Sequence, residues 1–259
     1  MEGNIMLLFG KLLPVFLPSR LKKQSMTYVV SVESLESRAM LATYSVSNLN
    51  NSGVGSFRDA IDQANANAGT DEIAFTVAGT VSLTESLPFI TQPVLIDGST
   101  APSFDGTPVV AINFDGASGF EFHEGSDGST LQSLAIVNAG TAGVTVSSND
   151  VSLFGNYIGV LVDGETPAGN TAGGLVITSS SSGNQIGKTI SVSSGSLAVA
   201  SGGNLISGNN GSGITIFGNN NLIQSNLIGT TISGDEALPN TGDGIEVKPG
   251  SEGNLIGND

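Results

Sequence analysis

The sequence lacks several residue types on which many functional sites depend. Its 259 residues include no cysteine, no tryptophan and a single histidine, and only 12% of them are charged. Without cysteine no disulfide can hold the fold together, so stability must come from a continuous core. A hydrophobic content of 39% is enough to build one, which argues against a mobile acidic tail. The absence of cysteine leaves the cellular compartment open.

Basic residues are almost missing from most of the chain. From position 42 onward the only lysines and arginines are Arg58, Lys188 and Lys248, against about twenty carboxylates, and the whole chain carries a net charge of −15. Binding to nucleic acid requires a basic surface, so this composition excludes it. An acidic surface instead favours solubility or the capture of cations such as Ca²⁺.

Residues 1–42 differ from the rest and are predicted to be a leader. They hold five of the eight basic residues, and their apolar run at 5–17 is too short to span a bilayer. Residues 35–42 (LESRAMLA) resemble the LEPR-XLL segment near the start of many planctomycete surface proteins. That resemblance implies export to a secreted or cell-surface location. The alternative is a disordered leader without a targeting role, with translation starting at Met26. No transmembrane span is expected in the body.

One helix is predicted near the start of the body, over residues 55–65. Ser56 is a suitable N-cap, Asp59 follows three residues later, and four apolar side chains share one face of the helix: Phe57, Ala60, Ile61 and Ala64. An apolar helix before a series of strands would cover the open end of a solenoid.

The second half of the chain repeats itself with a shift of 70 residues. Residues 138–189 align with 208–259, so that GVTV at 143–146 matches GITI at 213–216 and NYIG at 156–159 matches NLIG at 226–229. Short apolar runs at a fixed period, interrupted by Gly and Asn, are typical of solenoids. Strand-like triplets at 144–146, 175–177, 214–216 and 245–247 mark the start of successive coils.

These patterns predict an all-β fold, a right-handed parallel β-helix wound from one chain. Val, Ile and Leu should stack inward, while Gly and Asn form the corners, where an Asn side chain can bond to its neighbour in the next coil. Earlier strands are expected at 73–77, 81–83, 94–97, 109–114, 120–122 and 134–137. We assign residues 43–137 to the capping helix and first coils, and residues 138–259 to the repeats.

The chain resembles two groups of β-helical proteins. The SFRDAI segment at 56–61, followed by DEIAF at 71–75 and LIDG at 95–98, is similar to the head of many bacterial surface β-helix proteins. The repeats resemble the pectate-lyase-like superfamily and, more closely, the NxIxGNxIG-repeat proteins. This resemblance implies the fold, and its enzyme members would be polysaccharide lyases, uronan epimerases and polygalacturonases.

Candidate site residues are few. The carboxylates Asp163 and Glu165 of one loop, and Asp235 and Glu236 of the matching loop, are the candidates for Ca²⁺, as is the group Asp115, Glu121, Glu124 and Asp127. For ligand binding the candidates are Tyr157, Lys188 and Lys248, either lysine serving as an exposed base. His123 could move a proton between Glu121 and Glu124, or simply face solvent. No catalytic residue is assigned.

The loops offer one further possibility. Residues 160–173, 230–243 and the insertion 188–202 alternate between the two corners beside one strand face. They would form the two sides of a shallow groove along that face, or else be solvent-exposed loops without a function of their own.

The sequence therefore favours a non-catalytic, exported β-helical segment with a structural, adhesive or spacer role, whose partners would be polysaccharide or other surface proteins. The alternative is a Ca²⁺-dependent, lyase-like β-helix that binds or cleaves acidic polysaccharide. An enzyme is the less favoured reading. The final residues, NLIGND at 254–259, carry no capping pattern. We expect this end to continue into, or pack on, another unit.

Overall fold

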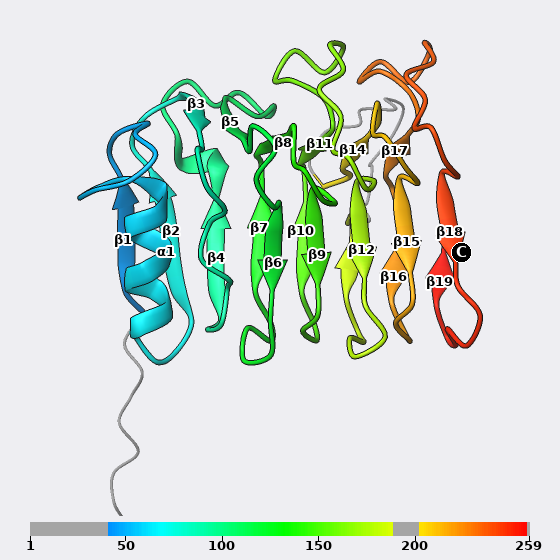
Figure 1. Ribbon diagram of the computed structural model, residues 1–259, viewed down its shortest axis with the longest axis horizontal. Coiled ribbons are helices and arrows are strands. Elements are labelled where there is room, and N and C mark those ends of the chain that lie inside the picture. The colour runs from blue at the N-terminus through cyan, green and yellow to red at the C-terminus, as the bar shows by residue number, and fades with distance from the viewer. Residues whose placement is uncertain (1–40, 189–201, 258–259) are drawn as a thin grey trace, which may run out of the picture. The chain divides into compact units, whose positions relative to one another are not determined.

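The computed structural model describes residues 41–188 and 202–257, which form a parallel β-helix (Figure 1). The first sheet contains β1 (Thr43–Val46), β2 (Asp71–Phe75), β4 (Val94–Asp97), β7 (Thr130–Gln132), β10 (Ser152–Phe154), β13 (Gln185–Ile186), β16 (Leu222–Ile223) and β19 (Leu255–Ile256). The second contains β3 (Gly79–Ser82), β5 (Val110–Asn113), β8 (Ala135–Val137), β11 (Tyr157–Ile158), β14 (Leu205–Ile206) and β17 (Leu227–Ile228). The third contains β6 (Phe120–Phe122), β9 (Val144–Val146), β12 (Leu175–Ile177), β15 (Ile214–Ile216) and β18 (Ile245–Val247).

Side chains alternate between the core and the outside along each strand. In the third sheet, Leu175 pairs in parallel register with Val144 on one side and Ile214 on the other, and all three are fully buried. The middle residue of each strand, such as Val176, faces outward and is partly exposed. This period of two places one apolar residue directly above another in successive coils, which gives a single continuous core.

Three ladders of asparagine, most of them buried, join the coils at their corners. They consist of Asn156, Asn204 and Asn226 between the first and second sheets; Asn170, Asn209 and Asn240 between the second and third; and Asn184, Asn221 and Asn254 between the third and first. In each ladder an Asn donates both its backbone N–H and its Nδ2–H to the Oδ1 of the Asn in the next coil. The asparagine bonds expected between coils are therefore confirmed.

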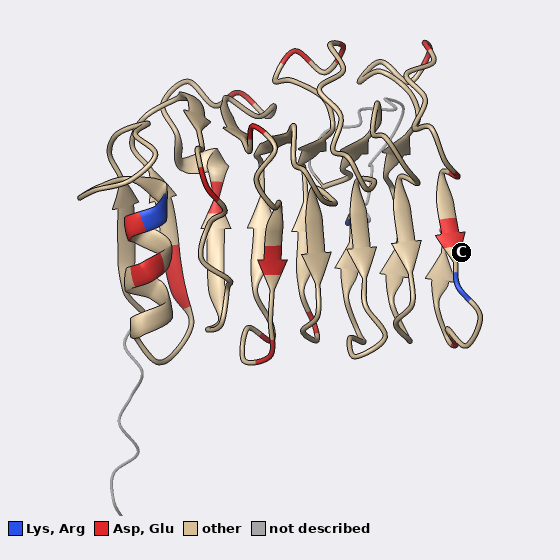
Figure 2. Ribbon diagram, in the orientation of Figure 1, with Lys and Arg blue, Asp and Glu red and all other residues tan. Residues whose placement is uncertain are grey.

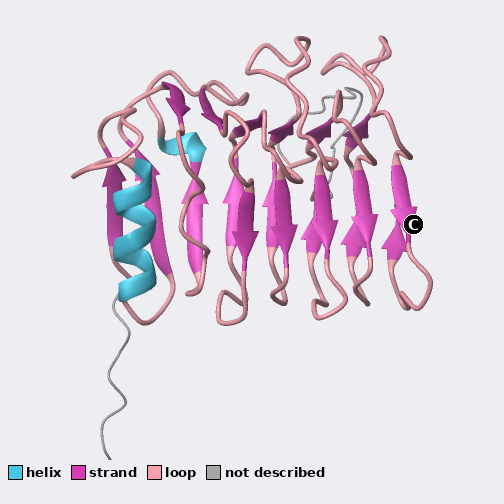
Figure 3. Ribbon diagram, in the orientation of Figure 1, coloured by secondary structure: helices cyan, strands magenta, loops and turns pink. Residues whose placement is uncertain are grey.

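Helix α1 (Phe57–Ala66) covers one end of the core (Figure 3). The Ser56 hydroxyl accepts a hydrogen bond from the Asp59 N–H, and the Asp59 carboxylate accepts one from the Gly55 N–H. These two bonds cross the first turn of the helix in opposite directions and stabilise its start. The apolar face predicted from the sequence is buried, and the Phe57 ring lies 5.3 Å from that of Phe75 and 5.8 Å from that of Phe120. The predicted capping helix is confirmed.

The predicted strands are found with small shifts, and some strands were not predicted. The four triplets from 144 to 247 are β9, β12, β15 and β18. The strand expected at 73–77 runs instead over Asp71–Phe75. Strands β1, β7 and β10 are not among the strands predicted from the sequence. Strand β7 buries only Leu131, which lies between two polar residues, so its sequence contains no apolar run. The leader and its motif lie outside the described residues except for Leu41 and Ala42. Among the described residues, no helix is long and apolar enough to cross a membrane.

The loops after β11 and β17 pack on the second sheet through a few of their apolar side chains. Their side chains Val160, Ile232 and Leu238 form a second apolar cluster with outward-facing strand residues of that sheet, namely Ala111, Ala135, Tyr157, Leu205 and Leu227. The described loops thus cover part of the face on which a groove was expected. The other proposed wall, residues 189–201 of the insertion, lies outside the described residues.

The glycines that end β13 and β19 offer a test of coil stacking. Gly187 and Gly257 occupy the same place in their coils, with φ of +83° and +98°. A Cβ on Gly187 would overlap the Gln224 carbonyl oxygen of the next coil, whereas one on Gly257 meets nothing within 4 Å. Both changes to alanine carry the same backbone strain. We expect Gly187→Ala to destabilise the protein by about 1–3 kcal/mol more than Gly257→Ala, measured by denaturant unfolding. Equal losses would contradict the packing described.

Candidate functional site

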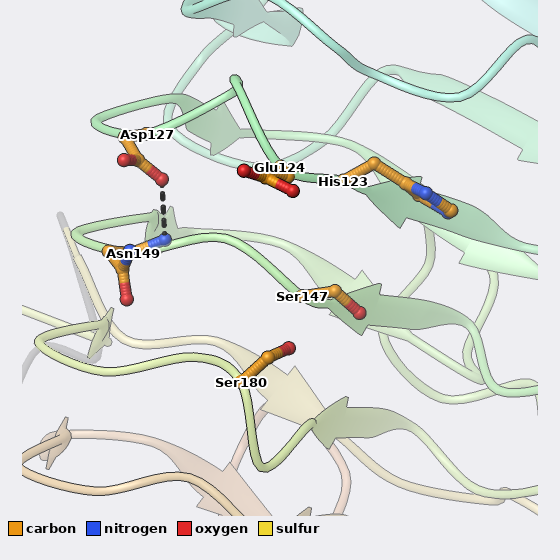
Figure 4. A pocket seen from close by; sticks show the side chains of 6 residues that line it. All are labelled: His123, Glu124, Asp127, Ser147, Asn149 and Ser180. Atoms are coloured by element: carbon orange, nitrogen blue, oxygen red, sulfur yellow. Dashed lines mark hydrogen bonds between the residues drawn. The ribbon is translucent and has the colours of Figure 1, made fainter.

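A polar pocket of about 420 Å³ lies where the chain leaves the third sheet. It is lined by His123, Glu124, Asp127, Ser147, Asn149 and Ser180, which come from three successive coils (Figure 4). His123 directly follows β6 and Ser147 directly follows β9, so the register of the sheet brings them side by side. Ser147, Asn149 and Ser180 were not predicted. Their position just after the aligned triplets was the signal that could have found them.

His123 is held in place from two directions. Its Nε2 lies 3.2 Å from Glu121 Oε2, and its ring stacks on Phe89 with a centroid distance of 4.1 Å and an interplanar angle of 11°. Its backbone N–H donates to the Ile90 carbonyl, which fixes the strand end. The expected closeness of His123 and Glu121 is therefore found. A proton shuttle would also need the ring to contact Glu124, and no hydrogen bond between His123 and Glu124 is found among the described residues.

Asp127 joins its own turn to the corresponding turn of the next coil. Its Oδ1 accepts a bond of 2.6 Å from the Ser148 hydroxyl and one of 2.9 Å from the Asn149 N–H. These bonds, the first above all, lower the pKa of Asp127 below its ordinary value because they stabilise the ionised form. Glu124 and Asp127 therefore give the pocket two carboxylates. No lysine or arginine lines it.

Removing the Ser148 hydroxyl should raise the pKa of Asp127. Because the folded-state pKa is depressed, the bond stabilises the fold above the unfolded-state pKa, and this contribution is lost as the pH falls through the folded-state pKa. In Ser148→Ala the carboxyl should titrate closer to its ordinary value of 3.8, as measured by NMR of the side-chain carbon. Ser147→Ala is the matched control, since its hydroxyl bonds Thr178 instead. An unchanged titration in Ser148→Ala would contradict the assigned cause.

The carboxylates proposed for Ca²⁺ do not converge in the part of the chain that is described. No group of three or more His, Asp or Glu side chains there is arranged to hold a metal ion. Asp163 binds its own loop, accepting from the N–H groups of Glu165 and Thr166 and from the Thr166 hydroxyl. These bonds lower the pKa of Asp163, with the Thr166 hydroxyl contributing most. In the matching loop, the Asp235 N–H donates to Ser233, so Asp235 and Glu236 do not repeat that arrangement.

Tyr157 is not presented to solvent. Its side chain belongs to the apolar cluster on the second sheet and is 5% exposed. Burial, with a smaller contribution from the negative charge of Asp105, raises the pKa of Tyr157 to about 12. A ring covered in this way offers no free face to a sugar, so its role is packing.

The two candidate lysines lie apart from the pocket. Lys248 forms an ion pair with Glu246, and its Nζ lies 5.8 Å from the centre of the Phe217 ring. The hydrogen bond from Lys248 lowers the pKa of Glu246. Lys188 lies over Phe154 at the same distance of 5.8 Å. Figure 2 shows how few basic side chains the described chain carries among its acidic ones. Neither lysine can act on a ligand held beside His123.

Comparison with known proteins gives no further guide to the site. No protein-family model matches the chain, and no curated protein is significantly similar to it in sequence.

Proposed function

We propose that this chain is a non-catalytic β-helical segment of a secreted or cell-surface protein, where it serves a structural, adhesive or spacer role. The observation that supports this most is the use of its buried polar residues. Seven buried asparagines are committed to the three ladders between coils: Asn156, Asn170, Asn184, Asn204, Asn209, Asn221 and Asn240. An enzyme would be expected to aim some of its buried polar groups at a cleft.

The export part of the proposal rests on resemblance. Residues 35–42 resemble the LEPR-XLL segment, and the repeats resemble those of exported bacterial β-helix proteins in the pectate-lyase-like superfamily. A rigid stack of coils joined by hydrogen bonds suits a spacer, because each added coil lengthens it without changing its cross-section.

The competing function is cleavage or binding of acidic polysaccharide. The pocket beside His123 weakens that case, because Glu124 and Asp127 would repel a uronate carboxylate and no cationic side chain there offsets them. A bound Ca²⁺ could reverse this repulsion, so the test must include the metal.

The experiment is a panel of uronate polymers offered to the purified protein with and without Ca²⁺. We expect neither unsaturated sugar ends, detected by absorbance, nor saturable binding, measured by titration calorimetry. Turnover that is abolished in His123→Ala, Lys188→Ala or Lys248→Ala would overturn the non-catalytic assignment. The substitution Val162→Ala, at a side chain that is exposed, serves as the control for nonspecific loss.

A further inference from the structure

Asp71, the first residue of β2, is fully buried. Its Oδ1 accepts hydrogen bonds of 3.0 Å from the Ala42 N–H and from Asn67 Nδ2, and its Oδ2 accepts one of 3.1 Å from the same Nδ2. Both oxygens act as acceptors, as they do in an ionised carboxylate. None of the ion pairs found among the described residues includes Asp71. In this part of the chain a buried negative charge therefore meets only neutral donors, which is a costly arrangement.

The same corner of later coils carries neutral acceptors instead. At several steps along the first sheet, a backbone N–H donates to the side chain of the aligned residue in the next coil, as that of Ala42 does to Asp71. The later donor and acceptor pairs are Val94 with Ser129, Val151 with Asn184, Asn184 with Asn221, and Asn221 with Asn254. A peptide N–H thus needs no charged acceptor at this corner. An aspartate in the position that faces Ala42 suits a donor that carries a positive charge.

We propose that the peptide bond between Leu41 and Ala42 is a processing site, and that Asp71 binds the α-ammonium group of the processed chain. Hydrolysis by an endopeptidase would consume one water, leave a carboxylate on Leu41 and turn the Ala42 N–H into an ammonium group. The bond lies where the chain enters the fold, because Leu41 is 66% exposed whereas the Ala42 carbonyl accepts the Glu72 N–H within the sheet. Proteases bind their substrates as extended, unpaired segments, so the cut precedes the pairing of β1 with β2.

The ammonium group would complete the site around Asp71. It would take the place of the present Ala42 N–H, 3.0 Å from Asp71 Oδ1, while Asn67 continues to donate to both oxygens. Opposite charges at this distance in a buried setting stabilise each other through a charge-assisted hydrogen bond. The inference goes beyond the proposed function, because it concerns the maturation of the chain and holds for a structural protein and an enzyme alike.

The experiment controls the cut. In the full chain, residues 36–41 are replaced by ENLYFQ, the recognition sequence of a protease that cuts after its glutamine, and the protein is produced with and without that protease. Cutting should raise the midpoint of thermal unfolding by about 3–6 °C, the shift expected for a tenfold change in the equilibrium between folded and unfolded protein. The matched control is Asp71→Asn, since asparagine is the residue that later coils place at this corner. In that variant, cutting should leave the midpoint unchanged.

The new amino group gives a second readout. An ammonium group held by Asp71 gives up its proton less readily, so at pH 7 it should react with acetic anhydride about tenfold more slowly than in the cut Asp71→Asn variant. Mass spectrometry of the N-terminal peptide measures this rate. Lys188 and Lys248, the two lysines after the cut, provide the internal reference.

Protein recovered from its own cells should begin at Ala42, as determined by N-terminal sequencing. A natural chain that begins at another residue would overturn the processing site. An equal shift of the midpoint in both cut proteins, equal labelling rates, or a cut chain that no longer folds would overturn the role of Asp71. None of these outcomes depends on the polysaccharide panel, so this inference and the proposed function can fail separately.

Discussion

Asn209→Ala is expected to lower the free energy of unfolding by about 3–5 kcal/mol. The Asn209 side chain is fully buried, and its Oδ1 accepts from both the backbone N–H and the Nδ2 of Asn170. Alanine would leave those two donors buried without an acceptor, because Asn170 is fully buried as well. The Nδ2 bonds to Ile158, Ser207 and Asn240 would be lost too. Denaturant unfolding measures the change.

The control for this loss is Asn50→Ala. Asn50 is exposed and its side chain makes no hydrogen bond among the described residues, so we expect a change below about 0.5 kcal/mol. The double variant Asn170→Ala/Asn209→Ala adds a sharper check. If the ladder acts as a unit, Asn170→Ala should lower the free energy of unfolding by at least about 1 kcal/mol less in the Asn209→Ala variant than in the unchanged protein. Strict additivity would show that the asparagines act independently.

Phe57→Ala should destabilise the protein by about 3–5 kcal/mol. The ring is fully buried at the start of α1, between Phe75 of the first sheet and Phe120 of the third. Its removal leaves a cavity between the helix and the end of the core, so the helix should loosen before the repeats do. Calorimetric unfolding gives the size of the effect, and amide exchange of residues 57–66 locates it.

Phe89→Ala is the matched control, because that ring is 49% exposed and lies outside the core. We expect it to cost less than about 1 kcal/mol. A similar loss in the two variants would mean that α1 does not close the core.

The sequence predicted the repeating part of the fold well because two short-range rules act together there. Buried residues alternate with exposed ones in triplets such as 175–177, and asparagine recurs at the corners. The rules fail where a strand buries a single residue, as in β7, since one apolar side chain gives no period. The capping helix was predictable because Ser56 and Asp59 mark its start locally.

The candidate site was harder to predict. The pocket joins His123, Ser147 and Ser180, which lie far apart in the sequence and meet only through the parallel register of β6, β9 and β12. Tyr157 looked available for ligand binding because nothing local shows that loops 160–173 and 230–243 fold back over the second sheet. Both the pocket and the burial of Tyr157 depend on packing between residues far apart in the sequence, and local sequence patterns give no information about such packing.

The most direct test of the proposed role is where the protein lies in its own cells. An antibody raised against the β-helical body is applied to intact cells and, in parallel, to permeabilised cells. We expect intact cells to be labelled at the level seen after permeabilisation, or the protein to be released into the medium. Labelling only after permeabilisation would contradict a secreted or cell-surface role.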